Sequence, residues 1–97
     1  MKQIRWNEEK NETLQIDRGV SFEMIVKAVE RGDILDDLIH PNQSKYSNQR
    51  MMIVKLNNYA YLVPYVENSS EIFLKTIIPS RKATKQYLIG DNKNESI

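Results

Sequence analysis

The stretch RMMIVKLNNYAYLVPYV, Arg50 to Val66, decides the fold class. Two runs rich in β-branched and aromatic residues flank Asn57 and Asn58, a pair that readily adopts the positive φ angles of a type I′ turn. A tight turn at this pair places Arg50 opposite Tyr65 in an antiparallel hairpin. The stretch therefore predicts two long strands joined by a two-residue turn.

A third antiparallel strand is expected over Glu71–Ile78, with Ile72 opposite Tyr65 if the polar turn before it is also tight. Counting from these pairs assigns side chains to two faces of the sheet. The first face carries Arg50, Met52, Val54, Leu56, Tyr59, Tyr61, Val63, Tyr65, Ile72, Leu74, Thr76 and Ile78. The second face carries Met51, Ile53, Lys55, Ala60, Leu62, Pro64, Phe73, Lys75 and Ile77. The first face is more apolar and should pack under a helix, whereas the second should be partly exposed. Pro64 cannot donate a ladder hydrogen bond and predicts a bulge or an early strand end.

Two helices are predicted before this sheet. Asn7 is a suitable N-cap for the first, which should end near Arg18 with Gly19 in a left-handed conformation. Its apolar face is thin, so we expect it to lie on the surface. Ser21 should cap the second helix, and Gly32 should close it. The second helix has one apolar stripe, made of Phe22, Ile25, Val26 and Val29.

The remaining segments complete a single α+β domain over residues 1–90. A short strand is predicted over 3–6, a short element followed by a loop over 33–48, and a short C-terminal helix over 80–87. Residues 91–97 should form a flexible tail. The order β-α-α-β-β-β-α predicts helices packed against an antiparallel sheet.

Composition excludes several classes of function. The chain has 97 residues, no cysteine and one histidine, so disulfides, thiolate metal sites and a cysteine nucleophile are excluded. No apolar run approaches the roughly 20 residues of a membrane helix, and no signal-peptide pattern follows the first residue, so we expect a cytoplasmic protein without a membrane partner. Residues 1–37 hold 6 basic and 9 acidic side chains, whereas residues 38–90 hold 7 and 2. This asymmetry suggests that one surface faces an anion.

The stretch TIIPSRKATKQY, Thr76 to Tyr87, concentrates that positive charge. Ser80 is a predicted N-cap, and the three basic side chains that follow, Arg81, Lys82 and Lys85, have no acid nearby. Like charges at this spacing repel one another unless an anion neutralises them, and phosphate groups are the obvious candidates. A solvated helix face is the alternative.

The tyrosines are a second indication of nucleic-acid binding. Tyr59, Tyr61 and Tyr65 share one strand, and aromatic rings beside basic residues can stack on unpaired bases. Simple cross-strand packing explains Tyr59 and Tyr61. Tyr65, paired with Arg50, is retained as a candidate for RNA binding.

The stretch DILDDLIH, Asp33 to His40, offers carboxylates and the single histidine. In a helix Asp36 and His40 would be neighbours, and a site for a hard metal ion is then conceivable. There are two other interpretations of His40. It could act as a lone acid or base in RNA chemistry, or it could be a surface residue without a role. No metal or other cofactor is predicted.

Two segments resemble a known family. IRWNEEKNETLQIDRGVSF is similar to the opening of BrnT-type toxins through Trp6, Asn7, Glu9, Lys10, Asn11, Gly19, Ser21 and Phe22. IIPSRKATKQY resembles the closing Ile-Ser-Ala-Arg-Lys-Ala-Thr segment of that family through Ile78, Ser80, Arg81, Lys82, Ala83 and Thr84. Arg50, which opens the middle strand, also fits. The family commonly has Lys-His-Gly before the second helix, where this chain has Asp17, Arg18 and Gly19.

The resemblance implies a RelE-like fold and a ribonuclease toxin of a bacterial type II toxin–antitoxin system. Such a toxin cleaves RNA without a metal, arrests translation and growth, and is neutralised by an antitoxin, typically with a ribbon-helix-helix DNA-binding domain. Operator DNA would be reached only through the antitoxin.

From the resemblance and the charge pattern together, we expect Arg50 and Arg81 to stabilise the charge on the phosphate. Lys10 is expected to contribute a further cation, and His40 a proton. Substrate binding is expected from Lys82, Lys85, Tyr65 and Lys75. A non-catalytic module that binds nucleic acid or protein is the alternative, and a metal-dependent hydrolase centred on DILDDLIH is a third.

Overall fold

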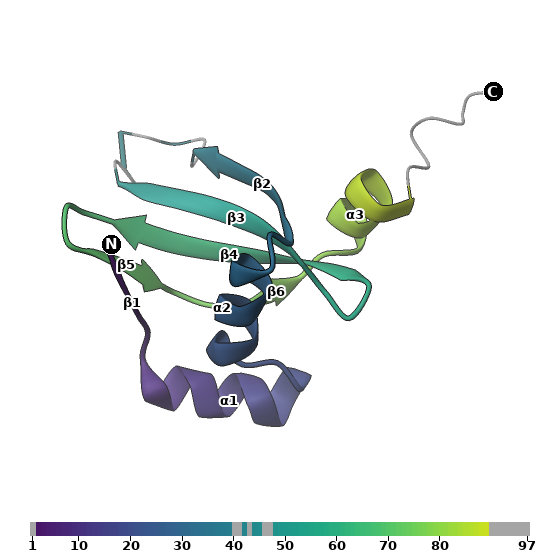
Figure 1. Ribbon diagram of the computed structural model, residues 1–97, viewed down its shortest axis with the longest axis horizontal. Helices are drawn as coiled ribbons and strands as arrows, with labels where there is room; N and C mark the ends of the chain where they lie inside the picture. The colour runs from purple at the N-terminus through teal and green to yellow at the C-terminus, as the bar shows by residue number, and fades with distance from the viewer. Residues whose placement is uncertain (1, 40–41, 43, 46–47, 90–97) are drawn as a thin grey trace.

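The computed structural model describes residues 2–39, 42, 44–45 and 48–89. A twisted sheet separates two N-terminal helices from a short C-terminal helix (Figure 1). The elements are β1 (Gln3–Arg5), α1 (Glu8–Arg18), α2 (Phe22–Glu30), β2 (Ile34–Ile39), β3 (Gln49–Leu56), β4 (Tyr59–Glu67), β5 (Glu71–Leu74), β6 (Ile78–Pro79), α3 (Arg81–Thr84) and the π-helical turn η1 (Lys85–Ile89). The predicted α+β class and the three predicted helices are confirmed. In the described part of the chain no helix is long and apolar enough to cross a membrane.

The sheet is built around the β3–β4 hairpin. Asn57 and Asn58 have φ angles of 54° and 63°, as a type I′ turn requires, and Arg50 lies opposite Tyr65. The strand order is β1-β5-β4-β3-β2, with β6 beside β4. The prediction of a purely antiparallel sheet is wrong at one place, because β1 pairs with β5 in parallel.

The third predicted strand differs from its prediction in register and in length. Tyr65 lies opposite Leu74 rather than Ile72. The turn is longer than expected because the Asn68 side chain accepts hydrogen bonds from the amides of Ser70 and Glu71. A shift of two residues leaves every side chain of β5 on its predicted face.

The ladder is interrupted after β5, and this interruption exchanges the predicted faces of two isoleucines. β5 ends at Leu74, and β6 begins at Ile78, which lies opposite Leu62 of the second face. Ile77 is completely buried in the core under the helices, whereas Ile78 is exposed. The prediction for this pair is wrong because residues 75–77 leave the ladder, so the alternation of side chains does not continue through them.

Pro64 causes neither a bulge nor a strand end. β4 continues to Glu67, and Pro64 lies opposite Met51 in an uninterrupted register. The Pro64 carbonyl accepts a hydrogen bond from the Lys75 amide, so the Pro64 nitrogen faces the side of β4 where the chain passes from β5 to β6. The prediction is wrong because no strand on that side needs the missing N–H.

The short element predicted after α2 is the strand β2. It pairs with β3 in an antiparallel ladder, with a register shift between Ile34 and Asp36. The helical arrangement considered for Asp36 and His40 is therefore wrong. Successive side chains of a strand point to opposite faces, so Asp36 and Asp37 cannot bind one ion together. His40 and the 91–97 tail lie outside the described residues.

The main core lies between α2 and the first face of the sheet. Phe22, Ile25 and Ala28 pack against residues that include Met52, Val54, Val63 and Leu74. The three predicted caps are present, because the side chains of Asn7, Ser21 and Ser80 each accept a hydrogen bond from the amide three residues later. α1 contributes mainly Leu14 to the core and leaves Ile16 83% exposed, as its thin apolar face predicts.

Asn11 connects the two helices through a buried polar contact. Its Oδ1 accepts the Phe22 amide at 2.7 Å, and its Nδ2 donates to Glu23 at 2.8 Å. The Asn11 side chain is only 2% exposed, so water cannot replace these bonds if they are lost. The angle between α1 and α2 therefore depends on one amide side chain.

We predict that Asn11→Ala lowers the free energy of unfolding by about 1–3 kcal/mol, because the buried Phe22 amide is left without an acceptor. Urea unfolding followed by circular dichroism measures the change. Thr13→Ala, on the exposed side of the same helix, is the matched control and should change stability by less than about 0.5 kcal/mol. Equal stability of the two variants would contradict the structural role of Asn11.

Candidate functional site

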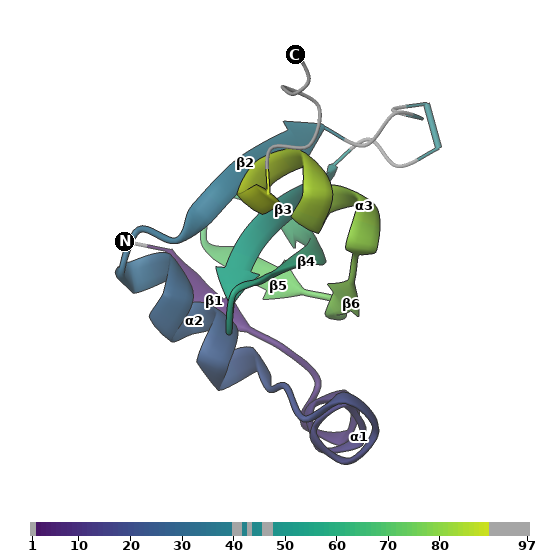
Figure 2. The ribbon, with the colours of Figure 1, turned by 90° about the vertical axis from the view of Figure 1, so that its right-hand side faces the viewer.

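The structure distributes the predicted site residues over three places. Arg81, Lys82 and Lys85 lie on α3 and η1, which pack on the second face of the sheet through Ala83. Arg50 and Tyr65 point to the first face, toward the core under α2. α2 and α3 lie on opposite sides of the sheet in Figure 2. The two predicted catalytic arginines are therefore not brought together.

The other two predicted cations are placed apart from each other. Lys10 lies on α1, exposed beside Asn7 and Thr13, and α1 lies well apart from α3 in Figures 1 and 2. Lys75 follows β5, where its amide bonds to Pro64 and its side chain is exposed. Lys75 lies beyond the end of β5 at Leu74, so the alternation of side chains along the strand does not assign it to either face.

α3 is fixed to the sheet by hydrogen bonds. The Ser80 hydroxyl accepts the Ala83 amide at 3.0 Å. The Thr84 hydroxyl donates to the Ser80 carbonyl and accepts the amide of Ala60 in β4, both at 2.8 Å. Thr84 is buried, as expected of a packing residue. These bonds hold the basic residues of α3 in a defined position although the helix is short.

The second face concentrates positive charge, and we call it the basic face. It carries Arg5, Lys55, Arg81, Lys82 and Lys85. Its acidic residues are Asp36 and Glu71. α1 and α2, on the opposite side, carry six acidic and three basic side chains. Among the described residues, Arg81, Lys82 and Lys85 have no carboxylate partner. The charge asymmetry along the sequence thus becomes an asymmetry between two faces.

Asp36 and Tyr87 form an ionisable pair on the basic face. The Tyr87 hydroxyl donates to Asp36 Oδ2 at 2.6 Å and joins η1 to β2. This hydrogen bond raises the pKa of Tyr87 and lowers the pKa of Asp36. The pair was not predicted, because it depends on the strand β2, and only the 3D structure brings residues 51 positions apart into contact.

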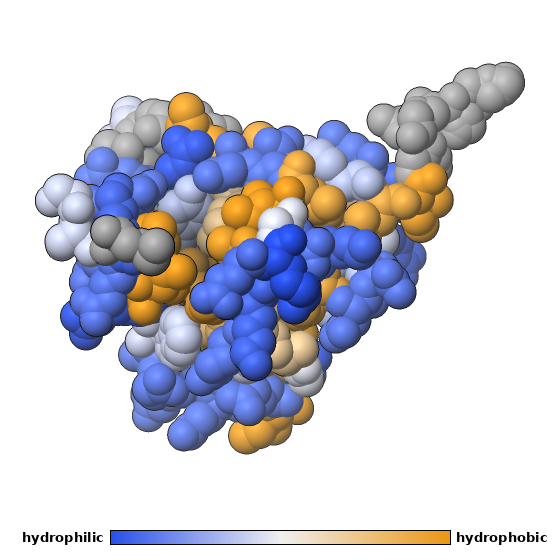
Figure 3. All heavy atoms as spheres, viewed as in Figure 1, coloured by the Kyte–Doolittle hydropathy of each residue, from blue (hydrophilic) through white to orange (hydrophobic). Residues whose placement is uncertain are grey.

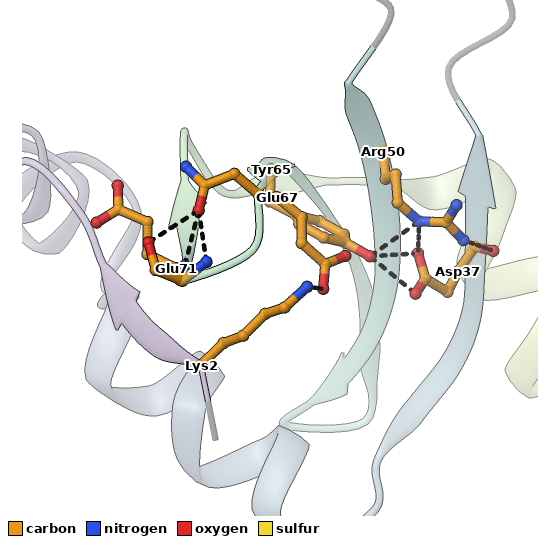
Figure 4. Close-up of polar contacts among 8 residues, drawn as sticks. Lys2, Asp37, Arg50, Tyr65, Glu67 and Glu71 are labelled. Atoms are coloured by element: carbon orange, nitrogen blue, oxygen red, sulfur yellow. Dashed lines mark hydrogen bonds and ion pairs between the residues drawn. The ribbon is translucent and has the colours of Figure 1, made fainter.

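Arg50, Tyr65 and Asp37 form a second polar cluster at the end of the first face (Figure 4). The Tyr65 hydroxyl donates to the Asp37 carboxylate at 2.8 Å. Arg50 Nε donates to the Tyr65 hydroxyl at 3.1 Å and lies 3.4 Å from Asp37 Oδ1. Asp37 thus forms an ion pair with Arg50, which the sequence analysis predicts to stabilise charge on a phosphate.

Burial determines what this cluster can do chemically. Tyr65 is 4% exposed, so its ring is not available to stack on a base. Desolvation and the hydrogen bond to Asp37 raise the pKa of Tyr65 to about 12. The hydrogen bond from Arg50 to Tyr65 and the charge of Asp37 raise the pKa of Arg50. The phenol therefore stays protonated and acts as a hydrogen-bond donor rather than as a base.

A polar pocket of about 370 Å³ opens beside Arg50. Lys2, Asn48, Gln49, Arg50, Glu67, Asn68 and Ser69 are among its lining residues. An ion pair of 2.5 Å between Lys2 and Glu67 forms one wall (Figure 4). Arg50 remains accessible from this pocket, but not from the basic face.

The described residues contain no group of three or more histidine, cysteine or acidic side chains able to hold a metal ion. Comparison with protein-family models, with curated proteins and with solved structures gives no match for this chain.

We predict that Tyr65→Phe changes the dependence of stability on alkaline pH. Above pH 10 an unfolded tyrosine loses its proton, whereas folded Tyr65 keeps it until about pH 12, so the folded state loses stability as pH rises between these values. This loss amounts to about 3 kcal/mol at 1.36 kcal/mol per pKa unit, and the phenylalanine variant lacks it. Urea unfolding of both proteins between pH 9 and pH 12 measures the difference. Parallel profiles would contradict a raised pKa at Tyr65.

Proposed function

We propose that this chain is a ribonuclease toxin of a type II toxin–antitoxin system, acting in the cytoplasm, with the basic face as its RNA-binding surface. The observation that carries the proposal is that α3 and η1 hold Arg81, Lys82 and Lys85 on one sheet face, with no carboxylate partner among the residues that the structure describes. Exposed cations without internal partners are available to RNA phosphates. The resemblance to BrnT-type toxins in both terminal segments supports the same function.

Cleavage through the 2′-hydroxyl of the substrate needs stabilisation of charge on the phosphate and proton transfer. Arg81 supplies the charge, and Lys82 and Lys85 hold the neighbouring phosphates. Lys75, exposed after the end of β5, is a further proposed contact to RNA. The Tyr87 hydroxyl on this face already donates to Asp36, which raises its pKa, so His40 stays the proposed proton donor. None of these steps requires a metal.

The proposal assigns no contact with RNA to Arg50, Tyr65 or Lys10, because these residues lie away from the basic face. Arg50 and Tyr65 hold the end of the sheet together through Asp37. The proposed neutralising partner is an antitoxin with a ribbon-helix-helix domain, and operator DNA is contacted only through that partner.

We predict that induced expression of the wild-type chain in a bacterium arrests growth and degrades RNA, and that Arg81→Ala/Lys82→Ala abolishes both effects. Removing the two cations removes the proposed contacts to RNA phosphates. Lys27→Ala/Arg31→Ala is the matched control, since it removes the same charge from the α2 side. Growth curves, total RNA on gels and immunoblots for equal protein levels are the measurements.

Arrest by the control and by the wild type, but not by the α3 variant, is the expected pattern. Arrest by all three proteins would show that the residues responsible for toxicity lie outside α3. No arrest by a folded wild-type chain that is free of antitoxin would contradict the toxin function.

A non-catalytic RNA-binding module is the second candidate. It is favoured by the positions of Arg50 and Arg81 on opposite faces, because the two arginines cannot act on one phosphate. This candidate keeps RNA binding but lacks cleavage.

We predict that the purified chain binds single-stranded RNA with an affinity that falls as salt rises. The slope of log K against log salt should lessen by about 1.4 in Arg81→Ala/Lys82→Ala, at roughly 0.7 per phosphate contact. Fluorescence anisotropy in the presence of a chelator measures binding, and gels of the same samples measure cleavage. Binding without cleavage would support the module, and an unchanged slope would contradict the basic face as the RNA site.

A further inference from the structure

α3 and η1 cover only one end of the basic face. They pack over Ile53 and Ala60, close to the turn between β3 and β4. In Figure 1 α3 lies at the right-hand end of the sheet, whereas β1 and β5 lie at the left. Four apolar side chains on the rest of this face lie outside both core clusters of the described chain, and we call them the Phe73 patch. They are Leu38, Met51, Val66 and Phe73.

The Phe73 patch runs across four neighbouring strands, β5, β4, β3 and β2. Phe73 of β5 lies opposite Val66 of β4, and Met51 of β3 lies opposite Leu38 of β2. Phe73 points to the basic face because its neighbour Leu74, within the same strand, is buried on the other face. Leu38 is exposed, and the other three side chains are half-buried. Packing in the core therefore does not account for an aromatic ring at position 73.

The first face of the sheet differs in charge. An apolar pocket of about 220 Å³ lies there beside α2, with Asp37 and Glu67 at its rim. Both carboxylates are already paired, one with Arg50 and the other with Lys2. Figure 3 shows this side of the molecule, with apolar surface between hydrophilic residues. Because α1 and α2 carry more acidic than basic side chains, an anionic chain is disfavoured on this side.

On the basic face, cations lie within reach of the Phe73 patch. The Thr84 hydroxyl of α3 accepts the Ala60 amide, and Ala60 and Val66 are six positions apart along β4. At about 3.3 Å per residue, the patch therefore lies about 20 Å from α3. The three basic side chains of α3 and η1 have no carboxylate partner among the described residues. One face thus offers an aromatic ring at one end and available cations at the other.

Single-stranded RNA has the chemistry that matches both ends. Its phosphates bind the cations, and its unpaired bases have flat faces that stack on aromatic rings. The bases of a duplex stack on one another, so their faces are not available to a protein ring. Arg5 adds a guanidinium opposite Phe73, and it is 60% exposed although Glu71 lies 3.6 Å away. The span of about 20 Å suits the roughly 4–16 nucleotides that one single-strand-binding domain contacts.

We propose that the Phe73 patch is a stacking platform for unpaired bases of single-stranded RNA. One base stacks on the Phe73 ring, while the cations of α3 and η1 hold phosphates further along the same strand. The proposal rests on RNA binding by the basic face and adds the class of RNA recognised there. Stacking releases no counterions, so the contribution of Phe73 to affinity does not depend on salt, unlike that of Arg81 and Lys82.

The test uses the full chain and a fluorescein-labelled single-stranded oligonucleotide of about ten nucleotides. Its 2′-O-methyl riboses prevent cleavage through the 2′-hydroxyl. Phe73→Leu should weaken binding at least about fivefold in fluorescence anisotropy, with an unchanged salt slope, because it removes the ring and keeps an apolar side chain. Phe73→Trp should restore the affinity. Met51→Leu, on the same patch, is the matched control and should leave the affinity unchanged.

Equal affinity of folded Phe73→Leu and wild type, while Arg81→Ala/Lys82→Ala weakens binding, would overturn the platform and leave RNA binding by α3 intact. No binding by the wild type would contradict both proposals. If Phe73→Leu fails to fold, amide chemical-shift changes in the wild-type chain decide. Changes at Arg5, Val66 and Phe73 are expected, and changes confined to α3 would overturn the platform. Self-association that Phe73→Leu abolishes would also overturn it, since a second copy would then cover the patch.

Discussion

The alternation of side chains along the β3–β4 hairpin is the constraint on which the rest of the structure depends. The turn at Asn57 and Asn58 sets the register, and the register sends Arg50 and Tyr65 to one face and Ile53 and Ala60 to the other. α2 then covers the first set and α3 the second. A slip of one residue would exchange the two faces and bury the Lys55 side chain under α2. The faces on which Arg50 and Tyr65 lie follow from this register.

The two faces have different chemical character because the helices that cover them have different composition. α1 and α2 bring acidic side chains to one side, and α3 brings basic side chains to the other. The domain thus has a side rich in carboxylates and a side rich in cations. The sheet lies between these two sides, so the side chains of α2 and those of α3 do not share one surface.

The cluster of Arg50, Asp37 and Tyr65 shows how a tertiary contact changes the role expected of a residue. An arginine at the start of a strand, opposite a tyrosine, was a reasonable candidate for binding phosphate. Asp37 lies on a neighbouring strand and satisfies both side chains, which gives the cluster a stabilising role at the end of the sheet. The same carboxylate then contributes to the rim of the apolar pocket.

The sequence by itself determined the local features, because each depends on residues close together in the chain. These are the three helix caps, the type I′ turn, the apolar stripe of α2, and the exposure of Arg81, Lys82 and Lys85 after Ser80. Only the tertiary structure decided the parallel pairing of β1 with β5, the exchange of Ile77 and Ile78, and the pairing of Asp36 with Tyr87. It also decided that Arg50 and Arg81 lie apart. These features depend on contacts between distant segments, and local propensity carries no information about which segments meet.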